Sequence, residues 1–117
     1  MSELRRPPAI EAFGAKGFRI EGVRYERSVL ILRDHVSGWS GEMSPEALSD
    51  VLAADRADLE FVILGVGPNM QPPPKALREA MAQAGVGLEV QTTPEAVRLY
   101  NLMAQEGRRV AAALVAV

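Results

Sequence analysis

The chain has 117 residues, of which 48% are hydrophobic and 24% charged, and its formal net charge is -2 at pH 7. This length accommodates one ordinary domain with one core, and the charge balance favours neither nucleic acid nor an anionic lipid surface as a partner. Cysteine is absent, which excludes disulfide bonds, thiolate metal sites and a cysteine nucleophile.

The N-terminal segment is polar and ends in two prolines. We therefore expect a flexible tail over residues 1–8 and a single α/β domain over residues 9–117. The arginine pair at positions 5–6 is not followed by the apolar stretch of a twin-arginine export signal. The longest apolar run, residues 61–66, is far shorter than the roughly 20 residues that span a bilayer. A cytoplasmic protein without membrane insertion is expected.

Short apolar segments separated by glycines fill the N-terminal half. Strands are expected at Ala9–Phe13, Phe18–Ile20, Val23–Tyr25 and Ser28–Leu32, because β-forming residues there end at turn residues. Their short connections predict an antiparallel meander. Another short extended piece is expected around Gly38-Trp39.

The periodicity changes at Ser44, where a helix is expected to begin. The Ser44 hydroxyl can accept a hydrogen bond from the first turn, and Pro45 has no N–H to leave unpaired. The apolar stripe of this helix would consist of Leu48, Val51 and Leu52.

From residue 59 onward the pattern alternates between strand and helix. The expected strands are Glu60–Leu64, Val86–Gln91 and Arg109–Val117, and the expected helices are Pro74–Ala84 and a segment from Thr93 to residue 107. Glycines at positions 85 and 107 suit the left-handed conformation that ends a helix. The alternation predicts helices packed on a sheet whose parallel pairs are joined by right-handed crossovers.

Several short motifs carry a family resemblance. In the C-terminal third these are Val90-Gln91-Thr92-Thr93-Pro94, Asn101-Leu102, and Glu106-Gly107-Arg108 followed by Ala112-Ala113-Leu114. Together with Gly65-Val66-Gly67, Trp39 and the early meander, they resemble the family of mitochondrial respiratory complex I assembly factor 3. That family includes prokaryotic relatives with an Mth-type domain of unknown function and the adipogenesis-associated Mth-domain protein. The similarity covers about residues 10–114, with one departure at Thr92, where relatives often have an acidic residue.

The resemblance implies a three-layer Mth-type α/β fold. Its central sheet would be mixed and largely parallel, with flanking helices and an N-terminal β-meander. For function it implies a non-catalytic binding or accessory protein that assists assembly of a respiratory, complex I-like, or other membrane protein complex. Protein partners are expected, and a homo-oligomer is compatible with this role. We expect no catalytic residues, no metal and no cofactor.

The strongest candidate for a ligand site is the turn Gly65–Asn69, which follows an apolar strand. Ligands of open α/β sheets bind at the carboxyl ends of strands. Gly65 and Gly67 would allow backbone N–H groups to face an anion or a carbonyl group, and Asn69 would add an amide. The turn lacks the third glycine of a dinucleotide fingerprint and the Gly-Lys-Ser/Thr of a P-loop. The other interpretation is that its glycines and the following prolines only shape a rigid strand-to-helix connection.

A second group of polar residues would converge with this turn: Thr92, Thr93, Asn101 and Arg108. Thr93 is also the expected N-cap of the last helix. Asn101 lies among apolar residues, where an amide needs specific partners, either a ligand or a structural loop. Arg108 would bind the last carbonyls of the helix or present a binding charge. These residues support an alternative function, a small-molecule-binding protein or unrecognised enzyme that uses the Gly65–Asn69 turn.

Two further side chains have an expected structural place. His35 is the only histidine and lies in Arg33–Ser37, interpreted as a solvated turn. It has no second imidazole for a metal site, and neighbours in sequence do not form a catalytic triad. Trp39, the only tryptophan, is expected in the core, since an exposed one would indicate a binding hot spot.

Overall fold

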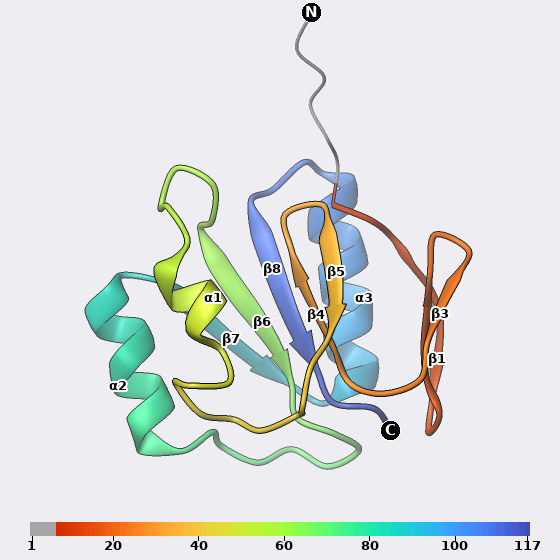
Figure 1. Cartoon of the computed structure of the whole chain (residues 1–117), viewed down its shortest axis with the longest axis horizontal. Helices are drawn as coiled ribbons and strands as arrows, with labels where there is room; N and C mark the ends of the chain where they lie inside the picture. Colours follow the sequence, from red (N-terminus) through yellow and green to blue (C-terminus); the bar gives the residue numbers. More distant parts are fainter. Residues whose placement is uncertain (1–6) are drawn as a thin grey trace, which may run out of the picture.

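The computed structural model describes residues 7–117, which form two sheets and three helices (Figure 1). In chain order the elements are β1 (Ile10–Gly14), β2 (Gly17–Ile20), β3 (Val23–Tyr25), β4 (Val29–Leu32), β5 (His35–Gly38), α1 (Ser49–Ala53), β6 (Phe61–Gly65), α2 (Lys75–Ala84), β7 (Gly87–Gln91), α3 (Thr93–Gln105) and β8 (Val110–Leu114).

The predicted tail falls mostly on residues 1–6, outside the described residues. Its last residue does not fit that prediction. Pro8 is buried, and its carbonyl oxygen accepts a hydrogen bond from the Tyr100 hydroxyl at 2.6 Å. The packed domain therefore includes Pro8.

The central sheet contains five strands in the order β5-β4-β8-β6-β7. Strand β6 pairs in parallel with β7 and β8, whereas β4 pairs antiparallel with β5 and β8. The predicted mixed sheet is confirmed, and its parallel pairing is confined to β8, β6 and β7. Because β6 and β7 are joined through α2, their pairing is the expected crossover unit.

The meander forms a separate antiparallel sheet in the order β1-β2-β3. The expectation that a fourth strand belongs to it is wrong, because β4 joins the central sheet. Val29, Leu30 and Ile31 are 0%, 6% and 0% exposed, so β4 buries both of its faces. Only a strand covered from both sides can do so, and the central sheet is covered in this way.

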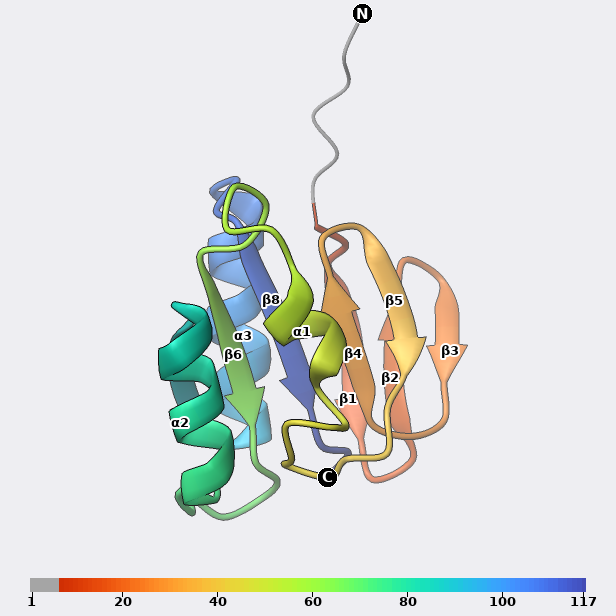
Figure 2. The same cartoon turned by 60° about the vertical axis from the view of Figure 1, so that its left-hand side comes forward.

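Three layers result (Figures 1 and 2). Helices α1 and α2 pack on one face of the central sheet, and α3 packs on the other face together with the meander. Neighbouring residues of β6 alternate between the two cores, with Val62 beside α1 and α2 and Ile63 beside α3. Trp39 is 7% exposed and belongs to the first of these cores, as expected, although its indole nitrogen has no hydrogen-bond partner among the described residues.

The first helix begins later than predicted. The Ser44 hydroxyl accepts a hydrogen bond from the Ala47 N–H at 3.1 Å, so the predicted capping geometry is present. Residues 45–48 form a turn, and the α-helix itself starts at Ser49. The Ser49 N–H reaches the Glu46 carbonyl three residues back at 3.4 Å, which interrupts the regular four-residue spacing.

The β4–β5 hairpin also differs from the prediction. Only Arg33 and Asp34 form the turn, with Arg33 in the left-handed region at φ 60°. His35 opens β5, opposite Leu32, so the predicted solvated turn is two residues long. Gly85 ends α2 in the expected left-handed conformation, at φ 74°.

Tyr100 fixes α3 against the N-terminal segment. Its side chain is fully buried, and burial raises the pKa of its phenol above the ordinary value of 10.0, with a further contribution from the Glu21 charge. The folded state holds this proton more tightly than the unfolded chain does. The contribution of the Tyr100 phenol to the free energy of unfolding is therefore complete below pH about 10 and is lost as the pH rises further.

We therefore expect the wild-type free energy of unfolding to fall by up to about 1.4 kcal/mol per pH unit above pH 10. Tyr100→Phe should lose this component of the alkaline dependence, whereas Tyr25→Phe, at the half-buried tyrosine, should keep it. Urea unfolding at a series of alkaline pH values measures both. An alkaline dependence that is the same in wild type and Tyr100→Phe would contradict the assignment.

Candidate functional site

The predicted turn starts where β6 ends, between β7 and β8. A Cβ atom added to Gly65 would lie 2.9 Å from Cδ2 of Leu114 and 3.1 Å from Cα of Thr93. Both distances are too short for a side chain to enter without displacing its neighbours. Glycine at this position therefore allows the start of α3 to approach the end of β6.

Thr93 connects three segments at this point. Its hydroxyl accepts a hydrogen bond from the Gly67 N–H at 3.0 Å and donates one to the Val115 carbonyl at 2.7 Å. Its backbone N–H donates to the Gly67 carbonyl at 2.8 Å, and the residue is fully buried. Thr93 thereby joins the glycine turn, α3 and the end of β8.

The N-cap prediction for Thr93 is wrong. Thr92 occupies the N-cap position, and no side-chain hydrogen bond caps the helix. The Thr93 hydroxyl is not available for capping because Gly67 and Val115 already use it.

Two backbone donors of the turn, the N–H groups of Val66 and Gly67, are also engaged. The Val66 N–H donates to the Gln91 carbonyl at 2.9 Å, and the Gly67 N–H donates to Thr93. Gly67 has φ 109°, a conformation that other residues rarely adopt. Asn69 is exposed, and its side chain makes no hydrogen bond within residues 7–117. These contacts favour the interpretation as a rigid strand-to-helix connection, and ligand binding by the turn stays a prediction.

Asn101 does not converge with the turn. Its Oδ1 accepts a hydrogen bond from the Ile10 N–H at 2.9 Å, and its Nδ2 donates to the Ile10 carbonyl at 2.9 Å. At a helical rise of about 1.5 Å per residue, Asn101 lies roughly 12 Å along α3 from Thr93. The expectation of convergence is wrong, because this amide fastens β1 to α3.

Asn101→Leu should lower the free energy of unfolding by about 2 kcal/mol, because both backbone groups of Ile10 lose their partner. Gln105→Leu, at an exposed position of the same helix, is the control and should change stability by less than about 0.5 kcal/mol. Urea unfolding compares the variants, and hydrogen exchange should become faster at the Ile10 amide only in Asn101→Leu. Unchanged exchange at Ile10 would contradict the structural role.

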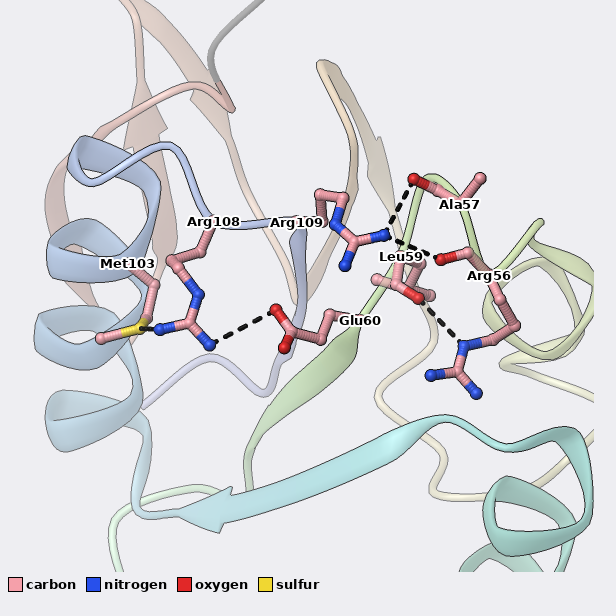
Figure 3. A network of polar contacts seen from close by, with 7 residues as sticks. All are labelled: Arg56, Ala57, Leu59, Glu60, Met103, Arg108 and Arg109. Atoms are coloured by element: carbon pink, nitrogen blue, oxygen red, sulfur yellow. Dashed lines mark hydrogen bonds and ion pairs between the residues drawn. The ribbon is translucent and has the colours of Figure 1, made fainter.

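Arg108 lies at the other end of β6 (Figure 3). Its Nη2 is 3.3 Å from the Glu60 carboxylate, its Nη1 is 3.8 Å from Sδ of Met103, and its guanidinium carbon is 5.7 Å from the Phe61 ring centroid. Glu60 precedes β6, whereas Gly65 ends it. Arg108 is thus separated from the glycine turn by the length of the strand, and the prediction that it joins that turn is wrong.

The same figure shows a second set of arginine contacts beside Arg108 (Figure 3). Nη1 of Arg109 donates to the carbonyls of Arg56 and Ala57 at 3.1 and 3.0 Å, and Nε of Arg56 donates to the Leu59 carbonyl at 3.2 Å. These bonds connect the segment before β6 with the segment before β8. Their partners are backbone carbonyls, which indicates a structural role.

The predicted site residues therefore divide into two groups. Residues 65–69 and 92–93 gather at the carboxyl end of β6, while Asn101 and Arg108 lie elsewhere. Within residues 7–117 no group of three or more histidine, aspartate or glutamate side chains is placed to hold a metal ion. In the same range no helix has the length and apolar character needed to cross a membrane.

The architecture defines the class of protein, a three-layer α/β domain with a mixed sheet and a separate N-terminal meander. A Mth938-like domain of Bordetella pertussis shares this fold, with a TM-score of 0.70 and 23% identity over 99% of this chain and 89% of that one. The chain belongs to the family described as a protein of unknown function (DUF498/DUF598), whose model matches residues 10–115.

Relatives confirm the resemblance to the assembly factor family. An uncharacterized protein of Rhodobacter capsulatus is 34% identical over 91% of this chain and 82% of that protein. The human NADH dehydrogenase (ubiquinone) 1 alpha subcomplex assembly factor 3 is 28% identical over 91% of this chain, which spans only 59% of the human protein. A solved structure from Rhodopseudomonas palustris is 38% identical, with a TM-score of 0.75 over 99% of this chain and 90% of that one.

Proposed function

We propose that this chain is a non-catalytic accessory protein that binds protein subunits and assists assembly of a respiratory, complex I-like membrane complex. The observation that carries the proposal is the similarity to the human assembly factor across almost the whole of this chain. The chain corresponds to part of that protein, so the assembly role is transferred as a proposal for the shared domain. We also propose that it acts in the cytoplasm.

The polar contacts support a binding role in preference to a reactive one. The buried side chains of Thr93 and Tyr100 and the half-buried side chain of Asn101 are each hydrogen-bonded to backbone groups. Side chains used in this way position segments of the fold and are not free to act on a substrate. A rigid domain with such contacts can present a fixed surface to a partner.

Capture from native cells tests the proposal. A chromosomally tagged copy is recovered from gently solubilised membranes and cytosol, and retained proteins are identified by mass spectrometry against an untagged strain. We expect subunits of a respiratory complex or membrane-insertion proteins to be enriched. Recovery of the tagged protein alone, or only with copies of itself, would contradict the assembly role.

The alternative, a small-molecule site at the Gly65–Asn69 turn, is favoured by one observation. The turn lies at the carboxyl ends of parallel strands, and the Asn69 side chain there is exposed and without a hydrogen bond within residues 7–117. A metabolite screen by thermal shift tests it with Asn69→Ala, a change at an exposed side chain. A ligand that stabilises wild type but not Asn69→Ala would support this site. Equal stabilisation of both would exclude Asn69 from it.

A further inference from the structure

The basic residues of the meander differ from those of the rest of the described chain. In residues 28–117 every lysine and arginine pairs with a carboxylate or donates to a backbone carbonyl. The cations of residues 7–27 are Lys16, Arg19, Arg24 and Arg27, and all are exposed. None of them has a hydrogen-bond or ion-pair partner within residues 7–117. Among residues 7–117, the unpaired positive charges are therefore gathered on one small sheet and the residues next to it, a segment that also carries the exposed Glu11, Glu21 and Glu26.

Two of these charges stand directly opposite each other. In the register of β2 and β3, Arg19 pairs with Arg24, and across β1 and β2 Arg19 pairs with Ala12. Residues opposite each other in an antiparallel pair project from the same face. The neighbouring position of β2, Phe18, faces the core, so Arg19 and Arg24 project from the outer face.

This cross-strand pair has an energetic meaning. Like charges directly opposite each other on a sheet lower its stability. No carboxylate within residues 7–117 forms an ion pair with either arginine, and the nearby Glu11 instead accepts a hydrogen bond from the Gly22 N–H. The arrangement is therefore not explained by the stability of the meander.

Two open hollows lie beside these residues. An open hollow of about 320 Å³ is lined by the β1–β2 hairpin and includes Lys16, Arg19 and Arg24. A second, of about 460 Å³, shares Arg24 and adds Tyr25, Glu26, Arg27, Ser28 and Gly38. Phe13 also lines the first hollow, but it pairs with Phe18 and therefore projects from the face opposite to Arg19 and Arg24.

We propose that the outer face of the meander is a docking surface for a short acidic segment of a protein partner. Carboxylates of that segment would pair with Arg19, Arg24 and Lys16. This inference rests on the proposed function for the kind of partner. In Figure 1 the meander lies at the side of the molecule away from α2, so a partner bound there leaves the opposite helical face uncovered.

The overall charge favours a short acidic segment over a long polyanion. The whole chain has a formal charge of -2, so the protein as a whole does not attract a long polyanion. A nucleic acid or an anionic bilayer would extend over surfaces beyond the meander, whereas a short peptide is confined to the cationic patch.

Charge reversal tests the docking surface. The variant Arg19→Glu/Arg24→Glu is compared with Lys75→Glu/Arg98→Glu, which changes the net charge equally at exposed cations of α2 and α3. The probe is a fluorescent synthetic peptide of alternating glutamate and glycine, titrated by anisotropy at low and at physiological salt. Thermal unfolding verifies that both variants are folded.

We expect wild type and the helix variant, Lys75→Glu/Arg98→Glu, to bind this peptide equally. The meander variant, Arg19→Glu/Arg24→Glu, should bind on the order of tenfold more weakly. Absence of binding to wild type, or equal weakening in both variants, would overturn the inference. Anionic vesicles and a single-stranded oligonucleotide are titrated in parallel. Tighter binding of either than of the peptide would overturn the assignment to a protein segment.

Capture with the same variants separates this inference from the proposed function. Loss of the respiratory subunits from the meander variant alone would support both. Their retention by all three proteins would overturn the docking surface and leave the assembly role intact. If wild type retains no such subunits, the assembly role fails, and the peptide titration by itself decides whether the surface binds acidic segments.

Discussion

Replacing Gly17 by alanine should lower the free energy of unfolding by about 3 kcal/mol or more, through backbone strain combined with steric overlap. Gly17 begins β2 at φ 124°, a conformation rarely adopted by other residues. A Cβ atom there would overlap the carbonyl oxygen of Tyr25 and lie 2.8 Å from the carbonyl carbon of Glu26. Both neighbours are backbone, so neither can move aside as a flexible side chain would.

Gly14 provides a matched control for this change. It pairs directly with Gly17 across β1 and β2, but a Cβ atom at Gly14 would meet nothing within 4 Å. Gly14→Ala should therefore change stability by no more than about 0.5 kcal/mol. Urea unfolding of the two variants measures the difference. Equal destabilisation would show that general stiffening of the hairpin, and not the approach of the Tyr25 carbonyl, is the cause.

Local signals were sufficient to predict most elements. The predicted strand Val86–Gln91 corresponds to β7, and the predicted helix Pro74–Ala84 corresponds to α2 followed by Gly85, because glycine and proline mark their ends within a few residues. The family resemblance predicted the three-layer arrangement and the mixed character of the central sheet.

Partner choice between distant segments could not be predicted in the same way. The apolar segment Ser28–Leu32 follows the meander closely in sequence, yet it pairs with β8 at the far end of the chain. The sequence indicates that the amide of Asn101 needs partners, but it does not identify Ile10, which is 91 positions away. The opposition of Arg19 and Arg24 likewise depends on the register of two strands. Each of these contacts is set by the packing of the whole domain.

The second large effect is expected at Thr93. Thr93→Val preserves the shape of the side chain but removes the hydroxyl that accepts from Gly67 and donates to Val115. A buried N–H and a carbonyl would both lose this partner, so the free energy of unfolding should fall by about 3 kcal/mol. Urea unfolding measures the loss, and hydrogen exchange should show faster exchange at the Gly67 amide.

Thr93→Ser is the control, because it keeps both hydrogen bonds and removes one methyl group, which should cost about 1 kcal/mol. A Thr93→Val variant as stable as Thr93→Ser would show that the two hydrogen bonds contribute little.

Capture of partners, under conditions where both variants are folded, separates the structural role of Thr93 from a role in partner binding. Retained partners in Thr93→Val would indicate that Thr93 only holds β6, α3 and β8 together. Partners lost only in Thr93→Val would indicate that the turn it fixes belongs to the binding surface.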